Sequence, residues 1–491
     1  MEGDMDISGR SAPEATAGSS IPAVDPHQHG LAPNAIGLLQ SIVISVANSA
    51  PTAAMTVTFA ALVVIASGGG AIAILITMLP MLVVAYSFQR LNRWEANCGA
   101  QYVWVGRAVG PNIGFMVGWV VLGALMLGTV ATVLPVGPSF LDLVGLNSSS
   151  QLGAVLSSTV LMLIVMVIAI LGITLTARVQ IAMAAIEYAI VAVLTIIGLW
   201  DTFISQPHGF VSPSWSWLSP TGVGGHGDLV GTLLLAVFLI AGWDASLYVN
   251  EETENADVTP GRAVIISVVF LGLFYMLMMF AFQAVAPVSE INAHAAQGLS
   301  FAADRVAGRT GDKAMSLAVL LSAVATTQIG FVTLSRVSYA MGSDGLLPAR
   351  FGQLHPRYRT PAFGTVLFAV ITIAVTGASV YSSSVSDAFA EIVATTGVLY
   401  GAFYAISAVT NAWYYRAELR RGAGDLIIVG VLPLAAAGFL TWIIVKSVAS
   451  FTRGENLTLI GVIASGLTLL AIAHLKKSPF FSIKRAKYGD E

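Results

Sequence analysis

The sequence is poor in charged residues and nearly free of cysteine. Asp, Glu, Lys and Arg make up 10% of its 491 residues, whereas soluble globular proteins carry about 25%. A soluble enzyme of this length would need more charge to cover its surface, so that class is excluded. The single cysteine, Cys98, rules out a disulfide framework and a multi-cysteine metal site. The net charge of −3 gives no indication of nucleic-acid binding.

Motifs for cofactors and metals are also lacking. The seven histidines do not fall into an HExxH or similar metal-binding spacing. The glycine run at 68–70 lacks the Lys-Ser/Thr that follows it in a phosphate-binding loop, so we interpret it as a turn. No nucleophile–base pair is visible. We therefore expect no cofactor, no metal and no enzymatic activity.

What the sequence does contain is long apolar runs. Hydrophobic residues make up 56% of the chain, and a membrane-spanning helix needs about 20 of them in succession. Continuous runs, rather than short alternating strands, predict an all-α membrane protein. We predict twelve spans, at approximately 36–66, 69–89, 113–136, 153–173, 180–202, 227–253, 262–287, 313–342, 362–380, 386–412, 424–447 and 457–475.

Polar segments at the two ends complete the organisation. Residues 1–33 lack the charged and apolar regions of a signal peptide, and we predict a disordered tail. The membrane domain covers 34–475, and a basic tail covers 476–491. With the N-terminus in the cytoplasm, 18 of the 23 Lys and Arg residues fall in cytoplasmic segments. We expect a multi-pass protein of the cytoplasmic membrane, in contact with lipid, with both termini in the cytoplasm.

The first and sixth spans are interrupted near their centres. Residues 36–66 would form a helix of about 46 Å, longer than the roughly 30 Å of hydrocarbon. In its middle, Pro51 removes a helical hydrogen bond, and Asn48 and Ser49 compete for the freed backbone. The sixth span places Gly242 beside Asp244 at mid-membrane, where a charge needs a cavity or a partner.

Two interrupted helices at matching positions, five spans apart, indicate a transporter built from inverted repeats. An unwound helix exposes N–H groups on one half and C=O groups on the other. It can therefore hold the carboxylate and the ammonium of an amino acid. The alternative is that Pro51 and Gly242 only kink packed helices. We favour the binding site because the two interruptions match.

Three stretches resemble the amino acid–polyamine–organocation (APC) transporter superfamily, in its bacterial amino acid permease type. They are 335–361 (SRVSYAMGSDGLLPARFGQLHPRYRTP), 91–119 and 241–264. The resemblance runs from about residue 36 to 475 and implies a LeuT-type fold. The inverted repeats would cover about 36–202 and 227–412, with peripheral helices over 424–475. It also implies alternating access driven by a proton gradient or by exchange.

The resemblance assigns roles at the two interruptions. In the family a Gly-Ser-Gly-type turn in the first span binds the substrate carboxylate, and residues 47–52 match it, although Pro51 has no N–H. An aromatic residue four positions before the glycine of the sixth span acts as a gate, and Phe238 matches it. Carbonyl groups beside the glycine receive the ammonium. The substrate-binding residues so implied are Ala47, Asn48, Ser49, Ala50, Pro51, Thr52, Phe238, Leu239, Ala241, Gly242, Trp243 and Asp244.

For three residues the sequence leaves more than one role open. Trp243 either contacts the substrate or packs against its surroundings. Asp244 holds a cationic group or relays a proton, or it caps the second half-helix. Glu187, an intramembrane carboxylate in the fifth span, is functional by default. In the register set by 178–180 it replaces a lysine that the family links to proton coupling. We expect Glu187 to couple protons or to contact the substrate; the alternative is a protonated structural group.

We predict secondary active transport of amino acids, coupled to protons. Pro51 lacks a donor for a carboxylate, and Glu187 and Asp244 add negative charge. A polyamine or another organic amine therefore remains an alternative substrate, and exchange of amino acids and amines remains an alternative mode of transport. An ion channel is less favoured, because channels repeat their filter by oligomer symmetry. The expected partners are a small-molecule substrate, protons and lipid. The patterns carry no prediction of the oligomeric state.

Overall fold

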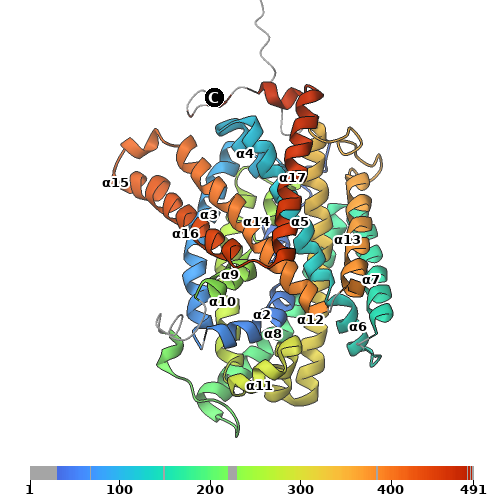
Figure 1. Ribbon diagram of the computed structural model, residues 1–491, viewed down its shortest axis with the longest axis vertical. Helices are drawn as coiled ribbons and strands as arrows, with labels where there is room; N and C mark the ends of the chain where they lie inside the picture. The colour runs from blue at the N-terminus through green and yellow to red at the C-terminus, as the bar shows by residue number, and fades with distance from the viewer. Residues whose placement is uncertain are drawn as a thin grey trace, which may run out of the picture.

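The computed structural model describes residues 30–66, 68–147, 150–218, 229–382, 385–483, 485–486 and 488. Within these ranges every regular element is helical, apart from one isolated β-bridge between Ile36 and Thr253. Among the described residues, twelve helices are long and apolar enough to cross a membrane, as predicted. They pack side by side in a bundle (Figure 1). Of the predicted disordered tail, residues 1–29 lie outside the described ranges.

The α-helices are α1 (Leu38–Asn48), α2 (Pro51–Ile65), α3 (Gly70–Trp94), α4 (Gln101–Ala108), α5 (Pro111–Val133), α6 (Val136–Leu143), α7 (Gln151–Leu171), α8 (Ile173–Trp200), α9 (Leu229–Ile240), α10 (Thr259–Phe282), α11 (Val288–Ala293), α12 (Gly298–Ser343), α13 (Ala362–Ser382), α14 (Val385–Tyr414), α15 (Ala423–Asp425), α16 (Leu432–Ala449) and α17 (Arg453–Leu475). Short 3-10 or π turns are η1 (Asp201–Ser205), η2 (Trp215–Leu218), η3 (Ala245–Glu252), η4 (Ala295–Gln297), η5 (Glu418–Arg420), η6 (Leu426–Val431) and η7 (Pro479–Ser482).

The spans follow the order of a LeuT-type fold. α1 with α2, α3, α5, α7 and α8 form the first five spans, and α9 with η3, α10, α12, α13 and α14 form the second five. α16 and α17 follow as two further spans, and α17, which is largely exposed, lies at the front of the bundle in Figure 1. We call the two ends of the bundle the α4 end and the α11 end, after the short helices that lie there.

The first span is broken as the sequence predicts. α1 ends at Asn48 and α2 begins at Pro51. Between them Ala50 adopts a left-handed conformation with φ 48°, which is strained for a residue with a Cβ atom. Pro51 is the first residue of α2, a position where its missing N–H costs nothing. Proline therefore starts the second half-helix and does not disturb the interior of a continuous helix.

The sixth span is broken at the matching position. α9 ends at Ile240, and η3 begins at Ala245. Gly242 lies in the link with φ 94°, a conformation that glycine adopts without strain. The two interruptions therefore use different means, an alanine followed by proline in one span and a glycine in the other.

Two boundaries differ clearly from the prediction. α8 begins at Ile173, although we predicted a start at 180, and α12 begins at Gly298, although we predicted 313. In α12 most of the additional residues form a short helical segment that carries Asp304 and Arg305, separated from the span by a kink at Ala307 and Gly308. Helices continue beyond the hydrocarbon region where hydropathy gives no signal, so apolar runs understate their length.

Candidate substrate site

A cavity lies where the two interrupted spans meet the third, eighth and tenth spans. It contains about 560 Å³ of empty space, including its open mouth. Within the part of the chain that the structure describes, no charged side chain lines it. The lining residues are Asn48, Ser49, Ala50, Ala53, Ala54, Leu125, Gly128, Thr129, Thr132, Pro135, Phe238, Ala241, Thr326, Thr396 and Tyr400.

The cavity lies on the α11 side of the two interruptions. Thr129 and Thr132 are in the second half of α5, and Thr396 is in the first half of α14. α5 runs towards the α11 end and α14 runs away from it (Figure 1). The lining residues of both helices are therefore displaced towards the α11 end of the bundle.

The α4 side of the site is closed by buried polar contacts. The Arg336 guanidinium donates two hydrogen bonds to the Glu252 carboxylate, at 3.0 and 3.2 Å, and both side chains are buried. The backbone N–H of Cys98 donates to Glu251 Oε1 at 2.9 Å. The backbone N–H of Ala35, before α1, donates to the Glu252 carbonyl at 2.8 Å. These contacts join η3 to α12, to the loop before α4 and to the segment preceding α1.

The two interruptions touch each other directly. Asn48 Nδ2 donates a hydrogen bond to the Gly242 carbonyl at 2.9 Å. A Cβ atom at residue 242 would lie 2.9 Å from the Asn48 carbonyl oxygen, closer than side chains normally approach. The Gly242 N–H donates to the Tyr404 hydroxyl at 3.1 Å. Gly242 is therefore held by the first span on one side and by α14 on the other.

Asp244 lies behind the cavity and not in its wall. Its carboxylate accepts hydrogen bonds from Gln101 Nε2 at 2.9 Å, Tyr248 Oη at 2.6 Å and Tyr404 Oη at 3.0 Å. It is fully buried. Asp244 stands at the N-cap position of η3 but makes no capping hydrogen bond with its side chain. Its donors come from α4, η3 and α14, so it ties the sixth span to its neighbours.

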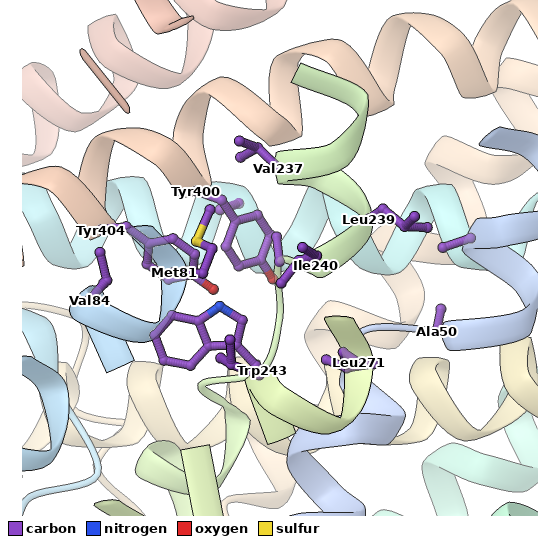
Figure 2. Packing of buried hydrophobic residues seen from close by; sticks show 14 of the residues in the cluster. Ala50, Met81, Val84, Val237, Leu239, Ile240, Trp243, Leu271, Tyr400 and Tyr404 are labelled. Atoms are coloured by element: carbon purple, nitrogen blue, oxygen red, sulfur yellow. The ribbon is translucent and has the colours of Figure 1, made fainter. Parts of the chain in front are cut away.

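Trp243 also belongs to the packing around the cavity. Its ring stacks on Tyr404 with centroids 4.9 Å apart, and it lies against Phe88 of α3 at 5.2 Å. Figure 2 shows it beside Tyr404 and Tyr400, with Met81 on the same side. The indole Nε1 is buried and has no hydrogen-bond partner among the described residues. Of these aromatic residues, only Tyr400 reaches the cavity wall.

Glu187 binds the start of the second half of the first span. Thr52 donates to Glu187 Oε1 through its hydroxyl at 2.7 Å and through its N–H at 3.4 Å. The same N–H lies 3.2 Å from Ser322 Oγ of α12. Glu187 is 1% exposed. Across the described ranges it forms no ion pair with a basic side chain. The carboxyl group therefore joins α8 to α2 through neutral donors, and the Thr52 N–H joins α2 to α12.

Five of the predicted substrate residues line the cavity, namely Asn48, Ser49, Ala50, Phe238 and Ala241. The others lie behind it. Thr52 binds Glu187, and the Ala47 carbonyl accepts from the Thr326 hydroxyl at 2.6 Å. Leu239 is fully buried, Pro51 begins α2, and Gly242, Trp243 and Asp244 form the supporting layer described above.

The sequence reasoning missed the contribution of α5. Leu125, Gly128, Thr129 and Thr132 of α5 line one wall of the cavity, together with Pro135 just before α6. The sequence feature that could have indicated this wall is the pair Thr129 and Thr132, because residues three positions apart lie on the same face of a helix. Thr129 Oγ1 donates to the Leu125 carbonyl at 2.7 Å, and Thr132 Oγ1 donates to the Thr129 carbonyl at 3.0 Å. Because both hydroxyl groups already donate to backbone carbonyls, their oxygen atoms face the cavity mainly as hydrogen-bond acceptors.

Comparison with known proteins agrees with this architecture. The low-affinity putrescine importer PlaP of Escherichia coli is 21% identical over 418 residues, which are 82% of this chain and 84% of that protein. The branched-chain amino acid permease BcaP of Bacillus subtilis is 25% identical over 330 residues, 63% of this chain and 67% of its own length. The methylthioribose transporter of Bacillus subtilis is 23% identical over 337 residues, with 64% and 69% covered.

These relatives are transporters and not enzymes, and each matches well over half of the chain. Residues 36–471 match the amino acid permease family, from the segment before α1 into α17. The match thus includes both interrupted spans and every residue that lines the cavity. The chain is a multi-pass membrane transporter that belongs to the amino acid permease family.

Proposed function

We propose that the protein is a proton-coupled secondary transporter of a small amine-bearing solute. It works by alternating access across the cytoplasmic membrane, with the α4 end in the cytoplasm. The distribution of Lys and Arg supports this orientation. The cavity is the substrate site, and the contacts around Arg336 and Glu252 close it towards the cytoplasm.

The observation that carries the proposal is the placement of the two carboxylates. A broken helix has a positive end at the start of its second half and a negative end at the finish of its first half. Glu187 accepts from Thr52 at the start of α2, and Asp244 stands at the start of η3. Both positive ends are thus matched by the protein's own carboxylates. At the negative ends, within the described residues, the Thr326 hydroxyl donates to the Ala47 carbonyl and the Asn48 amide donates to the Gly242 carbonyl, and both donors are neutral.

This arrangement favours a solute with a positive charge. A substrate carboxylate would compete with Glu187 for the start of α2, where Pro51 already lacks an N–H. An ammonium group would be attracted by the ends of α1 and α9 and by the hydroxyl oxygens of the cavity wall. An amine without a carboxylate therefore fits the site better than an amino acid. The putrescine importer among the relatives supports this substrate class.

An α-amino acid is the second candidate. Ser49 lines the cavity, and its buried hydroxyl has no hydrogen-bond partner within the described residues. It could donate to a substrate carboxylate and replace the donor missing at Pro51. The branched-chain amino acid permease among the relatives supports this alternative.

Glu187 is the proposed proton carrier. It contacts Thr52 of the interrupted span, so its protonation changes the hydrogen bonding at the start of α2. A neutral carboxyl group binds the Thr52 hydroxyl and N–H less strongly than a carboxylate does. Proton release and uptake at Glu187 would therefore be linked to the position of α2 relative to α8 and α12.

Uptake into proteoliposomes tests the proposal. Labelled putrescine, a monoamine and a panel of neutral amino acids are each offered with and without an inward proton gradient. Gradient-stimulated uptake of the amines, with weaker or no uptake of amino acids, is the expected result. Stimulated uptake of amino acids alone would support the second candidate. No stimulated uptake of either class would contradict the proposed function.

A further inference from the structure

The described residues that follow α17 pack against the α4 end of the bundle. It follows α17, a helix in which only Gly466 and Ala473 are buried and whose last residue, Leu475, is 83% exposed. A helix that exposes leucine and isoleucine on this scale faces lipid, so its last residue marks the border of the hydrocarbon. We call the described residues among 476–488 the C-terminal strap.

Aromatic and backbone contacts hold the strap in place. Phe480 is buried against Gly106 and Tyr102, and the Ser478 hydroxyl donates to the Asp344 carbonyl at 3.2 Å. The N–H of Ala486 donates to the Arg107 carbonyl at 2.9 Å. At its end, the Tyr488 hydroxyl donates to Glu418 Oε1 at 2.6 Å. The strap therefore connects α17, α4 and the segment after α14.

The strap also carries exposed basic side chains, of which the Arg485 guanidinium lies beside Gly110 at the start of α5. Lys476, Lys477 and Arg485 are exposed, and in the described part of the chain none of them forms an ion pair. The sequence 476–488 also contains Lys484 and Lys487, which lie outside the described residues. This density of positive charge directly beyond a membrane span matches the negative surface of an anionic leaflet.

The neighbouring carboxylates are already engaged. Glu95 is paired with Arg107, and Glu418 is paired with Arg90. Asp344 accepts from the Tyr102 hydroxyl at 2.5 Å. These three carboxylates therefore do not pair with Lys476, Lys477 and Arg485, and the three basic side chains can bind an anionic ligand.

We propose that the C-terminal strap is a binding surface for anionic phospholipid headgroups, formed by Lys476, Lys477 and Arg485 on a segment docked by Phe480 and Tyr488. The lipid stabilises the docked strap because it neutralises the positive charges of these exposed side chains. The strap also contacts α4, whose first residue, Gln101, donates to Asp244 behind the cavity. Lipid binding at the strap is thereby connected to the supporting layer of the substrate site.

The test uses the full-length protein in neutral detergent and requires no knowledge of the substrate. The midpoint of thermal unfolding is measured with added phosphatidylglycerol, with phosphatidylcholine at the same concentration, and with inorganic phosphate. For the unchanged protein, phosphatidylglycerol should raise the midpoint by at least about 2 °C more than phosphatidylcholine does. Inorganic phosphate should give no comparable rise.

Two sets of variants test whether the basic residues of the strap cause the difference between the two lipids. The triple variant Lys476→Gln, Lys477→Gln and Arg485→Gln should lose most of the difference between the two lipids. A matched triple variant at three other exposed arginines, Arg350→Gln, Arg357→Gln and Arg420→Gln, should keep it. Phe480→Ala, which removes a docking contact and no charge, should reduce it. Equal responses to both lipids, or an undiminished difference in the strap triple variant, would overturn the proposal. A phosphate effect as large as that of phosphatidylglycerol would assign the surface to free anions and overturn the lipid assignment.

Discussion

Asn48 and Gly242 join the two interrupted spans into one unit. The amide of Asn48 donates to the Gly242 carbonyl at 2.9 Å, and the Asn48 carbonyl lies where a side chain at residue 242 would have to be. The left-handed φ of 94° requires glycine for a second, independent reason. A movement of either half-helix is therefore transmitted to the other across this contact.

Replacement of Gly242 by valine should abolish transport. The branched side chain would collide with the Asn48 backbone and would be strained at this φ, at a cost of about 1–3 kcal/mol in the free energy of unfolding. We expect at least a tenfold loss of uptake in proteoliposomes, measured beside the thermal unfolding midpoint. Gly377→Ala is the matched control, because a Cβ at Gly377 has nothing within 4 Å. Normal uptake by Gly242→Val would show that the contact between Asn48 and Gly242 is not needed for transport.

Replacement of Glu187 by glutamine should remove the pH dependence of uptake. Glutamine keeps the size of the side chain and can still accept from Thr52, but it cannot exchange a proton. Uptake at a fixed substrate concentration is measured between pH 5 and 8, with and without a proton gradient. Glu391→Gln, at another carboxylate of the membrane domain, is the control and should keep the dependence. An unchanged pH profile in Glu187→Gln would exclude Glu187 as the proton carrier.

Asparagine at position 244 should affect all substrates alike. The Asp244 carboxylate accepts three hydrogen bonds, and an amide would place a donor opposite one of those donors. We expect a loss of about 1–3 kcal/mol in the free energy of unfolding and similar reductions in uptake of amines and amino acids. A loss confined to amines would show instead that Asp244 contacts the ammonium group.

Thr129→Val should weaken substrate binding with little effect on folding. Valine has nearly the shape of threonine, but it lacks the hydroxyl oxygen that Thr129 offers at the cavity wall. The hydroxyl of Thr129 donates only to the backbone of its own helix, so its loss leaves no side-chain partner unsatisfied. We expect a rise in KM of about threefold to tenfold, corresponding to one neutral hydrogen bond. Thr468→Val, an exposed threonine of α17 with the same backbone bond, is the control.

The docking of the C-terminal strap should weaken at acidic pH. Partial burial raises the pKa of Glu418, but the hydrogen bond from Tyr488 and the ion pair with Arg90 outweigh it and leave the pKa below its usual value. A carboxyl group with a lowered pKa contributes stability above its unfolded pKa, about 4.3, and this contribution is lost as the pH falls through the folded value.

Thermal unfolding of Glu418→Gln and of the unchanged protein measures this contribution. The variant should unfold at a lower temperature at pH 7, and the two midpoints should converge as the pH falls below about 4. Tyr488→Phe, which removes only the hydroxyl that donates to Glu418, should show part of the same effect. A constant difference between the midpoints across this pH range would mean that the charge of Glu418 does not hold the strap.

The spans and their interruptions were predictable because their signals are local. An apolar run of sufficient length, or a proline or glycine inside one, is visible within a short window. The matching breaks at Pro51 and Gly242 could be located in this way. The layer behind the cavity could not, because its contacts join distant residues. Thr52 and Glu187 are 135 positions apart, and Gln101 and Asp244 are 143 apart.

The predicted function of Asp244 illustrates this limit. A carboxylate beside a helix break matches both a substrate ligand and a helix cap, and only the fold reveals Gln101, Tyr248 and Tyr404 around it. The α5 wall was missed for a related reason. Thr129 and Thr132 resemble ordinary threonines of a membrane span until α5 is placed beside the first and sixth spans.

The ion pair between Arg336 and Glu252 has a consequence for the rate of the proposed cycle. Both side chains are almost completely shielded from water, and they belong to two different elements, α12 and η3, on the closed α4 side of the site. Opening this end separates two charges that must find water or new partners at the same moment. Release of substrate through the α4 end should therefore be a discrete, thermally activated event with a steep temperature dependence, and not a gradual widening of the path.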